Sequence, residues 1–160
     1  MINNTMENII IRKATLNDIE SIAEFNYNLA LETENKTLNR QILTKGVESI
    51  LIDDNKGFYV LALLNNKVIG QLMITYEWSD WRNANFWWIQ SVYVVPEYRN
   101  SGVFKTLFEY IKKLAEEHKD VCGLRLYTEQ NNTNAIIAYK KLGMYQSNYL
   151  MFELEFNNKD

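Results

Sequence analysis

The segment over residues 86–114 constrains the fold more than any other part of the sequence. Residues 86–94 are rich in aromatic and β-branched side chains, as a central β-strand is, and this run stops at Pro96, the only proline of the chain. From Val103 onward, apolar residues recur at helical spacing. The segment therefore predicts a strand, a tight turn that contains Gly102, and a helix.

The rest of the chain extends this pattern to the order β-α-α-β-β-β-α-β-α-β-β. Thr15–Asp18 resembles a capping box with Asp in place of Glu or Gln, and a helix should follow it. Asn65–Asn66 separates two short apolar runs and predicts a hairpin turn. Strands are expected over 9–13, 58–64, 68–76, 86–94 and 123–128, with two more near the end of the chain, and a short helix over about 40–51. This order favours an α/β fold with a mixed, mostly antiparallel central sheet flanked by helices.

Length and composition favour one domain over residues 1–160, since 160 residues contain no repeat and no linker. Seventeen Lys and Arg against 20 Asp and Glu give a net charge of -3, which argues against a nucleic-acid partner. No apolar run reaches the roughly 18 residues of a membrane helix. Met1–Glu7 also lack the features of a signal peptide. We expect a cytoplasmic protein with no membrane partner.

The scarcity of Cys and His excludes several kinds of site. A single cysteine, Cys122, rules out an intramolecular disulfide and a Cys-rich zinc site, in keeping with a reducing compartment. We interpret Cys122 as a small buried hydrophobe. A Ser-His-Asp triad would have to use His118, whose place at the polar end of a predicted helix explains it without catalysis. We expect no metal site.

The first of two informative motifs is Arg99-x-x-Gly102, directly before the predicted helix. The start of a helix presents unpaired N–H groups and the positive end of the helix dipole. Backbone amides from Arg99 to Lys105 could therefore hold an anion such as a pyrophosphate. The alternative is an ordinary turn with a solvated Arg. The chain contains neither a Walker-type phosphate loop nor the dinucleotide-binding fingerprint.

The second motif is Asn-x-x-Ala-x-x-x-Tyr-x-x-x-Gly, which runs from Asn132 to Gly143 after the strand predicted at 123–128. Asn132 can cap a helix, Tyr139 would lie within it, and Gly143 can end it. The alternative to a functional role is a capped helix that carries a buried tyrosine.

In this order and separation, the two motifs resemble the GNAT superfamily of N-acetyltransferases, whose members transfer acetyl from acetyl-coenzyme A to an amine. The resemblance extends from Ile9 to about Phe156 and implies acetyl-coenzyme A as co-substrate. The family motif Gln/Arg-x-x-Gly-x-Gly/Ala falls on Arg99, Gly102 and Phe104, where Phe104 replaces a small residue. The residues that the resemblance implies for coenzyme binding are Val92, Tyr93, Val94, Arg99, Asn100, Ser101, Gly102, Val103, Phe104, Lys105, Asn132 and Tyr139.

The resemblance also implies catalytic roles. Tyr139 falls where the family has the tyrosine that protonates the departing thiolate, a role that suits a phenol with a reference pKa of about 10. Packing against the coenzyme is the alternative. Gln90 falls where the family commonly has a Glu, and it could orient the substrate or a water but cannot accept a proton. A water chain or another carboxylate would then deprotonate the amine; the candidates are Glu32 and Glu34 after the first helix, or Glu77 and Asp80 after the third strand.

The expected acceptor is the primary amine of a small molecule, which attacks the thioester directly. A protein or peptide amine is an alternative, and so is a non-catalytic acyl-coenzyme A sensor, which Gln90 and Phe104 would favour. Four tryptophans could form an apolar or cation–π wall for the acceptor, or serve the core and a homodimer surface; they are Trp78, Trp81, Trp87 and Trp88. Adjacent residues of a strand point to opposite faces, so Trp87 and Trp88 cannot line the same site.

Overall fold

The computed structural model describes residues 8–156, so the interpretation of Met1–Glu7 lies outside the described residues. The chain divides into two compact units, of which the first ends at Leu126 and the second begins at Tyr127. The single domain predicted over 1–160 stays a prediction.

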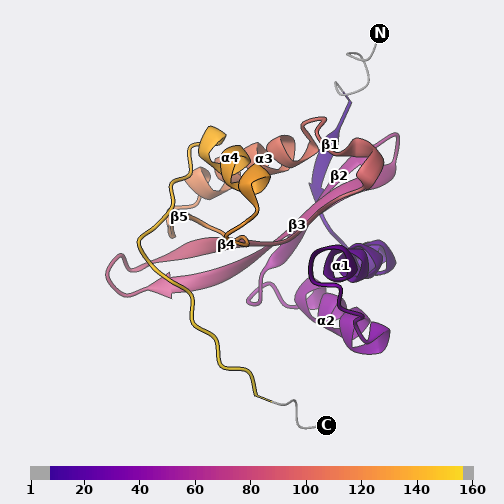
Figure 1. The fold of residues 1–160 in the computed structure, drawn as a ribbon, viewed down its shortest axis with the longest axis horizontal. Coiled ribbons are helices and arrows are strands. Elements are labelled where there is room, and N and C mark those ends of the chain that lie inside the picture. The colour runs from indigo at the N-terminus through magenta and orange to yellow at the C-terminus, as the bar shows by residue number, and fades with distance from the viewer. Residues whose placement is uncertain (1–7, 157–160) are drawn as a thin grey trace. The chain divides into compact units, whose positions relative to one another are not determined.

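The first unit contains one five-stranded sheet with the strand order β1-β2-β3-β4-β5 (Figure 1). Neighbouring strands are antiparallel from β1 to β4, and β5 runs parallel to β4. This arrangement confirms the predicted mixed, mostly antiparallel sheet. The strands are β1 Ile10–Lys13, β2 Phe58–Leu64, β3 Lys67–Ser79, β4 Ala84–Val94 and β5 Val121–Arg125, and the helices of this unit are α1 Ile19–Glu34, α2 Arg40–Ile52 and α3 Val103–Glu117, with short 3-10 turns at Leu16–Asp18 and Pro96–Tyr98.

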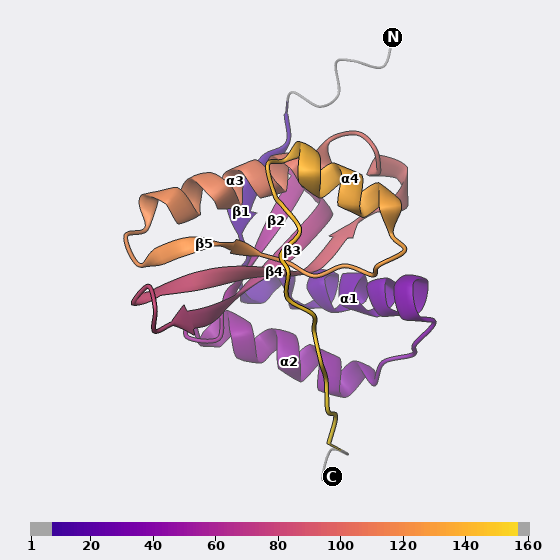
Figure 2. The same cartoon turned by 60° about the vertical axis from the view of Figure 1, so that its left-hand side comes forward.

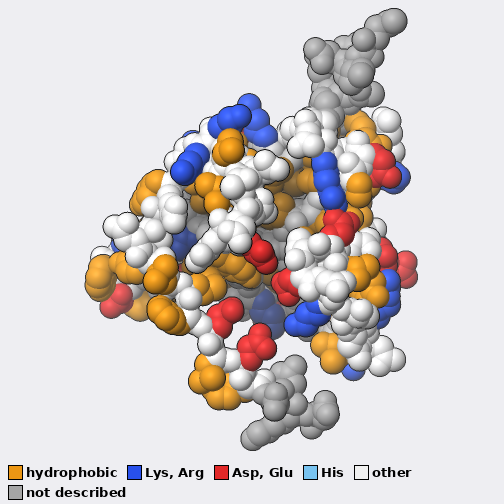
Figure 3. Space-filling view, viewed as in Figure 1, with side chains coloured by type: hydrophobic (Ala, Val, Ile, Leu, Met, Phe, Trp, Pro, Cys, Tyr) orange, Lys and Arg blue, Asp and Glu red, His pale blue; other side chains and the backbone are white. Residues whose placement is uncertain are grey.

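Helices cover both faces of this sheet, with α1 and α2 on one side and α3 on the other (Figures 1 and 2). On the first side, Ile22 and Val47 pack with Tyr59 and Leu61 of β2 in one buried cluster. On the other side, α3 buries Val103, Leu107, Phe108, Ile111 and Ala115. Acidic and basic side chains are interspersed over α1 and α2 (Figure 3), and Arg40 of α2 pairs with Glu24 of α1 at 2.6 Å.

Local sequence signals account for several element boundaries. The Asp18 carboxylate accepts hydrogen bonds from the Thr15 N–H at 2.8 Å and the Thr15 hydroxyl at 3.1 Å, which confirms the predicted capping box. Asn65 and Asn66 both have positive φ, 49° and 63°, as a type I′ hairpin turn requires. At the first boundary a side chain accepts a hydrogen bond from a backbone N–H, and at the second two asparagines adopt the left-handed conformation that the turn requires.

The second unit contains one helix in its described part, α4 Thr133–Lys141. The two strands predicted near the end of the chain are wrong for residues 145–156, which form neither helix nor strand. Their apolar side chains are exposed, as at Phe152, where the exposed fraction is 89%. Apolar alternation favours a strand only where a partner strand pairs with it, and these residues have none in the described structure.

Two smaller expectations also differ from the structure. Helical spacing over 40–51 predicts that Ile42 shares the inward face of α2 with Val47 and Ile50, but the exposed fraction of Ile42 is 66%, and Val47 and Ile50 are the buried residues of that helix. Cys122 is half-buried in β5 and not a fully buried hydrophobe. Both residues lie at the margin of the apolar core, where spacing alone does not determine burial.

The Arg12–Asp18 pair generates a stability prediction. Both Asp18 oxygens accept from Arg12 at 2.8 Å, and this hydrogen bonding is the main reason that the pKa of the largely buried Asp18 is lowered. Asp18→Asn should lower the free energy of unfolding by about 1–3 kcal/mol at pH 7. A lowered pKa means that this stabilisation is complete above the unfolded-state pKa of about 3.9 and is lost as the pH falls through the folded-state value.

Urea denaturation at pH 7 and at lower pH measures this difference. The gap between wild type and Asp18→Asn should shrink in acid, because a protonated Asp resembles Asn. Asp54→Asn is the matched control, since its pair with Lys13 is exposed on both sides and should contribute less than about 0.5 kcal/mol. Equal losses in the two variants would contradict the special role of Asp18.

Candidate active site

A bulge interrupts β4 at Ser91. Gln71 of β3 pairs with Tyr93, whereas Met73 pairs with Gln90, so β4 carries one more residue than β3 between these pairs. Ser91 has a φ of 49°, a left-handed conformation that residues other than glycine seldom adopt. Such bulges are over-represented at sheet edges and next to active sites.

Beside this bulge, β4 parts from β5. In the described chain, the parallel pairing of these two strands ends at Trp88 and Arg125, while β4 continues to Val94. The backbone of Val92 and Tyr93 therefore has no strand partner on its β5 side among the described residues. An unpaired strand edge can form backbone hydrogen bonds with an extended ligand.

The loop after β4 leads directly into the start of α3. Asn100 and Gly102 have left-handed φ values of 61° and 92°, and Gly102 is the N-cap of the helix. Within residues 8–156 no side-chain hydrogen bond caps this helix start, and a Cβ added to Gly102 would meet no atom within 4 Å. The backbone N–H groups at the start of α3 are therefore available to a ligand, and space is open next to Gly102. Such a helix start can bind an anion.

Phe104, the residue that departs from the family motif, is the second residue of α3 and packs along this helix. Its ring lies 6.2 Å from the ring of Phe108, measured between centroids, and Phe108 is buried in the core. Phe104 is half-buried. The large side chain is thus accommodated by the apolar surface of its own helix.

Arg99 lies at the centre of a polar cluster that joins α1, β4 and the loop. Its Nε donates to the Val94 carbonyl at 2.8 Å, and a terminal nitrogen pairs with Glu32 at 2.6 Å. The same Glu32 carboxylate accepts from the Tyr93 hydroxyl at 3.0 Å. Burial and the Glu32 hydrogen bond raise the pKa of Tyr93, so its phenol stays protonated as a donor. Glu34 is exposed at the end of α1.

The other candidates for the catalytic site lie on β3, on β4 and in the hairpin that joins these strands. Gln90 donates to the Thr75 hydroxyl. Glu77 pairs with Arg125 at 2.6 Å and accepts from the Trp88 indole, so this carboxylate already has two strong donors. Asp80 accepts from the Trp81 N–H at 2.9 Å in the hairpin that joins β3 to β4.

The four tryptophans do not form one wall. Trp87 is buried in the core, 5.3 Å from the Phe58 ring, whereas Trp88 lies on the opposite face of β4 with Glu77. Trp78 and Trp81 are exposed, at 62% and 84%. The expectation that Trp87 and Trp88 face opposite sides is confirmed, and His118 lies at the end of α3 beside the Trp87 ring.

In the second unit, the predicted residues lie on α4. The Asn132 side chain caps this helix by accepting from the Ala135 N–H at 3.1 Å, as the sequence predicted. Burial raises the pKa of Tyr139, so its phenol keeps its proton at neutral pH. A protonated phenol is the form that a general acid requires.

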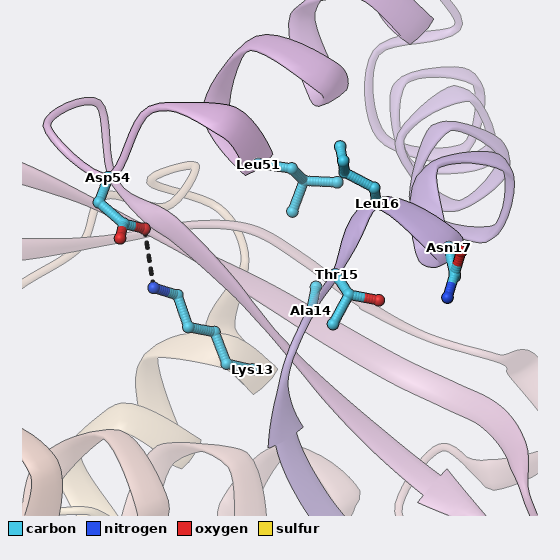
Figure 4. Close-up of a pocket in the computed structure, with 7 residues that line it drawn as sticks. All are labelled: Lys13, Ala14, Thr15, Leu16, Asn17, Leu51 and Asp54. Atoms are coloured by element: carbon cyan, nitrogen blue, oxygen red, sulfur yellow. Dashed lines mark hydrogen bonds and ion pairs between the residues drawn. The ribbon is translucent and has the colours of Figure 1, made fainter.

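One surface pocket lies elsewhere in the first unit (Figure 4). It has a volume of about 470 Å³ and is lined by Lys13, Ala14, Thr15, Leu16, Asn17, Leu51 and Asp54. Its two charged groups neutralise each other, since Lys13 pairs with Asp54 at 2.8 Å. The start of α1 is separated from Glu32 by roughly 20 Å of helix, at about 1.5 Å per residue. This pocket is therefore not part of the candidate site.

A network of hydrogen bonds between partly and fully buried side chains next to the bulge was not predicted from the sequence. Gln71 of β3 is fully buried and donates to Asn26 of α1 at 2.7 Å and to the Ser91 carbonyl at 3.2 Å. Asn26 in turn donates to the Tyr59 hydroxyl at 2.8 Å. A single polar residue amid the apolar run of β3 was the available signal for Gln71.

Two other kinds of feature do not occur in residues 8–156. This part of the chain holds no group of three or more His, Cys, Asp or Glu side chains arranged to bind a metal. It also has no helix that is long and apolar enough to cross a membrane.

A model of the acetyltransferase (GNAT) family matches residues 16–144, which include the bulge, the Arg99 loop and α4. The chain belongs to the GNAT acetyltransferase family. It is therefore an acyltransferase, as the two motifs predicted. This GNAT protein is 25% identical over 133 residues to the catalytic subunit of the N-terminal acetyltransferase B complex of Arabidopsis thaliana, an alignment that covers 83% of the chain and 71% of that subunit.

Other relatives match this GNAT protein over shorter or longer stretches. Streptothricin acetyltransferase of Escherichia coli is 29% identical over 82 residues, which cover 51% of the chain and 44% of that enzyme. A solved structure described as a possible acetyltransferase from Clostridium difficile 630 is 51% identical, with a TM-score of 0.87 and coverage of 94% and 99% of the two chains. A predicted acetyltransferase from Clostridium acetobutylicum, solved with acetyl-CoA, shares the fold at 20% identity, with a TM-score of 0.73 and coverage of 93% and 96%.

The left-handed conformation of Gly102 generates a prediction with a matched control. A Cβ would meet no atom within 4 Å at either Gly102 or Gly46, so steric clash contributes at neither position. Gly102→Ala should lower the free energy of unfolding by about 1–2 kcal/mol, because its φ of 92° strains any residue with a Cβ. Gly46→Ala should raise it by about 0.5–1 kcal/mol, because Gly46 lies inside α2. Chemical denaturation of both variants measures this, and changes of equal sign would refute the assignment.

Proposed function

We propose that this chain transfers an acetyl group from acetyl-coenzyme A to the primary amine of a small molecule by direct attack. The observation that carries the proposal is the uncapped start of α3 next to the unpaired edge of β4. Together they offer an anion site and a strand edge in one place, and membership of the family supports the acetyl donor.

The residues of the loop fit the coenzyme by their chemistry. The N–H groups of the first turn of α3, with the open space at Gly102, would bind the pyrophosphate. Arg99 belongs to the loop that leads into this turn, and its guanidinium would add charge-assisted hydrogen bonds. The backbone of Val92–Val94 would pair with the amide groups of the pantetheine arm. Bound there, the co-substrate supplies an acetyl thioester, an activated acyl group.

In the proposed reaction, a neutral amine nitrogen forms a bond to the acetyl carbon and the carbon–sulfur bond breaks. The Val92 N–H would stabilise the negative charge that develops on the carbonyl oxygen. Tyr139 would donate its proton to the departing thiolate, a role supported by the raised pKa of its phenol. The products are an N-acetylated amine and coenzyme A.

The amine must also lose a proton, and Gln90 has no group that can accept it. Of the carboxylates considered, Glu32 has the best support, since it is hydrogen-bonded to Tyr93, next to Val92 on β4. Glu77 also has two donors, but it lies opposite Phe86, in the part of the sheet where β4 still pairs with β5 and before the bulge. We assign Glu32 the role of accepting this proton, directly or through a water, and of attracting a cationic amine.

The acceptor class rests on relatives. The similarity to streptothricin acetyltransferase supports a small-molecule amine. The alignment with an N-terminal acetyltransferase subunit over most of the chain favours peptide N-termini as the second candidate. The single cysteine supports the cytoplasm as the compartment, and the homodimer stays a prediction.

Calorimetric titration with acetyl-coenzyme A, followed by a thiol-release assay on a panel of small amines and peptides, tests the proposal. Binding with turnover on small amines supports it, and turnover only on peptides favours the second candidate. Binding without turnover on any amine would indicate a sensor. Absence of binding would overturn the coenzyme site itself.

The role of Tyr139 predicts a separation of binding from turnover. Tyr139→Phe should lower kcat about 10²- to 10⁴-fold, the usual contribution of general acid–base catalysis, and leave coenzyme binding nearly unchanged. Tyr145→Phe is the matched control, because Tyr145 is exposed in the same unit. Full activity in Tyr139→Phe would exclude the phenol as the acid.

The role of Arg99 predicts the opposite behaviour. Arg99→Ala should weaken coenzyme A binding about 10- to 100-fold, because it removes a charge-assisted contact to phosphate. Arg82→Ala, at an exposed arginine of the β3–β4 hairpin, should bind as wild type does. Isothermal titration measures both constants, and equal affinities in the two variants would contradict the phosphate role.

A further inference from the structure

We propose that Gln71 is a positioning residue that aims the Val92 N–H at the acyl group, by holding the Ser91 carbonyl on the opposite side of the same peptide. This inference rests on the proposed function, and it concerns residues to which the family motif assigns nothing. It starts from burial, because the described residues contain two buried polar or charged side chains, Asp18 and Gln71.

Asp18 has a structural explanation, whereas Gln71 needs one. Asp18 caps the start of its helix and pairs with Arg12. Gln71 lies in the middle of β3, has no exposed surface, and its Oε1 accepts no hydrogen bond from any described residue. An unsatisfied buried acceptor costs stability, so an apolar residue of the same size would suit the core better. The amide must therefore serve something other than the core.

Both N–H bonds of the Gln71 amide are used, and they fix its orientation. One points to Asn26 Oδ1 at 2.7 Å and the other to the Ser91 carbonyl at 3.2 Å. A carbonyl can only accept, so the Ser91 contact determines which end of the Gln71 amide is the donor. Asn26 is then held as acceptor toward Gln71 and as donor toward the Tyr59 hydroxyl. These hydrogen bonds link α1, β2 and β3 to the bulge of β4.

The Ser91 carbonyl belongs to the peptide whose N–H is that of Val92. The described chain contains no cis peptide bond, and in a planar trans peptide the C=O and the N–H point in opposite directions. Gln71 extends from β3, so the Ser91 carbonyl points to the β3 side and the Val92 N–H points to the other side. That other side is where β4 has parted from β5 and where the proposed thioester would lie.

The bulge itself needs this support. Ser91 has left-handed φ, which costs a residue with a Cβ free energy, and the bulge displaces its peptide from the regular ladder. Without the hydrogen bond from Gln71, the Ser91–Val92 peptide would be free to rotate, and the Val92 N–H would no longer point toward the acyl group. A donor that is misdirected by a fraction of an ångström loses much of its effect on the transition state.

The experiment compares four variants in steady-state kinetics and coenzyme calorimetry. Gln71→Met keeps the side-chain length and removes both donors, and its kcat should fall about 10- to 100-fold with a coenzyme Kd within about threefold of wild type. Gln41→Met, on the exposed face of α2, is the matched control and should keep wild-type kinetics. Gln71→Met kinetics within twofold of wild type would overturn the inference.

The second pair of variants tests the anchor and guards against misfolding of Gln71→Met. Asn26→Leu removes the acceptor of Gln71 and should lower kcat, whereas Asn26→Asp keeps an acceptor oxygen toward both Gln71 and Tyr59 and should restore kcat to within about threefold of wild type. A purely structural role would lower thermal stability in both Asn26 variants without this rescue. Equal kcat in the two would overturn the inference.

A third readout does not depend on turnover. The amide resonance of Val92, followed by NMR, should shift and its hydrogen exchange should accelerate in Gln71→Met but not in Gln41→Met. If the wild-type protein acetylates no amine, the proposed function fails while this readout still tests the positioning. An unchanged Val92 amide in a folded Gln71→Met protein refutes the positioning whatever the activity.

Discussion

At Ser91, β4 carries one residue more than β3, and the sheet can accommodate it only by a local bulge that interrupts the ladder. The geometry of the candidate site depends on this constraint. Up to Trp88, β4 pairs with both β3 and β5; from the bulge onward, its β5 side has no strand partner among the described residues. The loop that carries Arg99 and the start of α3 follow within a few residues. The bulge, the open strand edge and the helix start thus lie within one short segment of the chain.

The charged side chains near the bulge and the open edge of β4 form ion pairs. Glu32 neutralises Arg99 beside the open edge, and Glu77 neutralises Arg125 where β4 and β5 still pair. The Arg125 guanidinium also lies 3.6 Å from the centre of the Phe86 ring. Partly buried charges require such partners, since an unpaired charge there would be costly. These two ion pairs make the candidate site polar and leave the paired side chains without net charge.

The parts of the fold and site that the sequence predicted are those governed by neighbours in the chain. The Asp18 capping box, the Asn65–Asn66 turn and the Gly102 start of α3 each depend on a few consecutive residues. The Glu32–Arg99 pair joins residues 67 positions apart, and no local pattern indicates it. Gln71 is similar, because its partners come from α1 and β4. The strands predicted after α4 failed for the same reason: a strand depends on its partner.

Asparagine occupies most of the left-handed backbone positions outside glycine in residues 8–156. Of the residues other than glycine with positive φ in the described structure, five are asparagines: Asn35, Asn65, Asn66, Asn83 and Asn100. The whole chain contains only six glycines. Asparagine tolerates the left-handed conformation, yet its side chain restricts the disordered polypeptide more than glycine does. The chain therefore loses less conformational entropy when it folds. Part of its stability comes from this restriction of the unfolded state and not from contacts in the folded one.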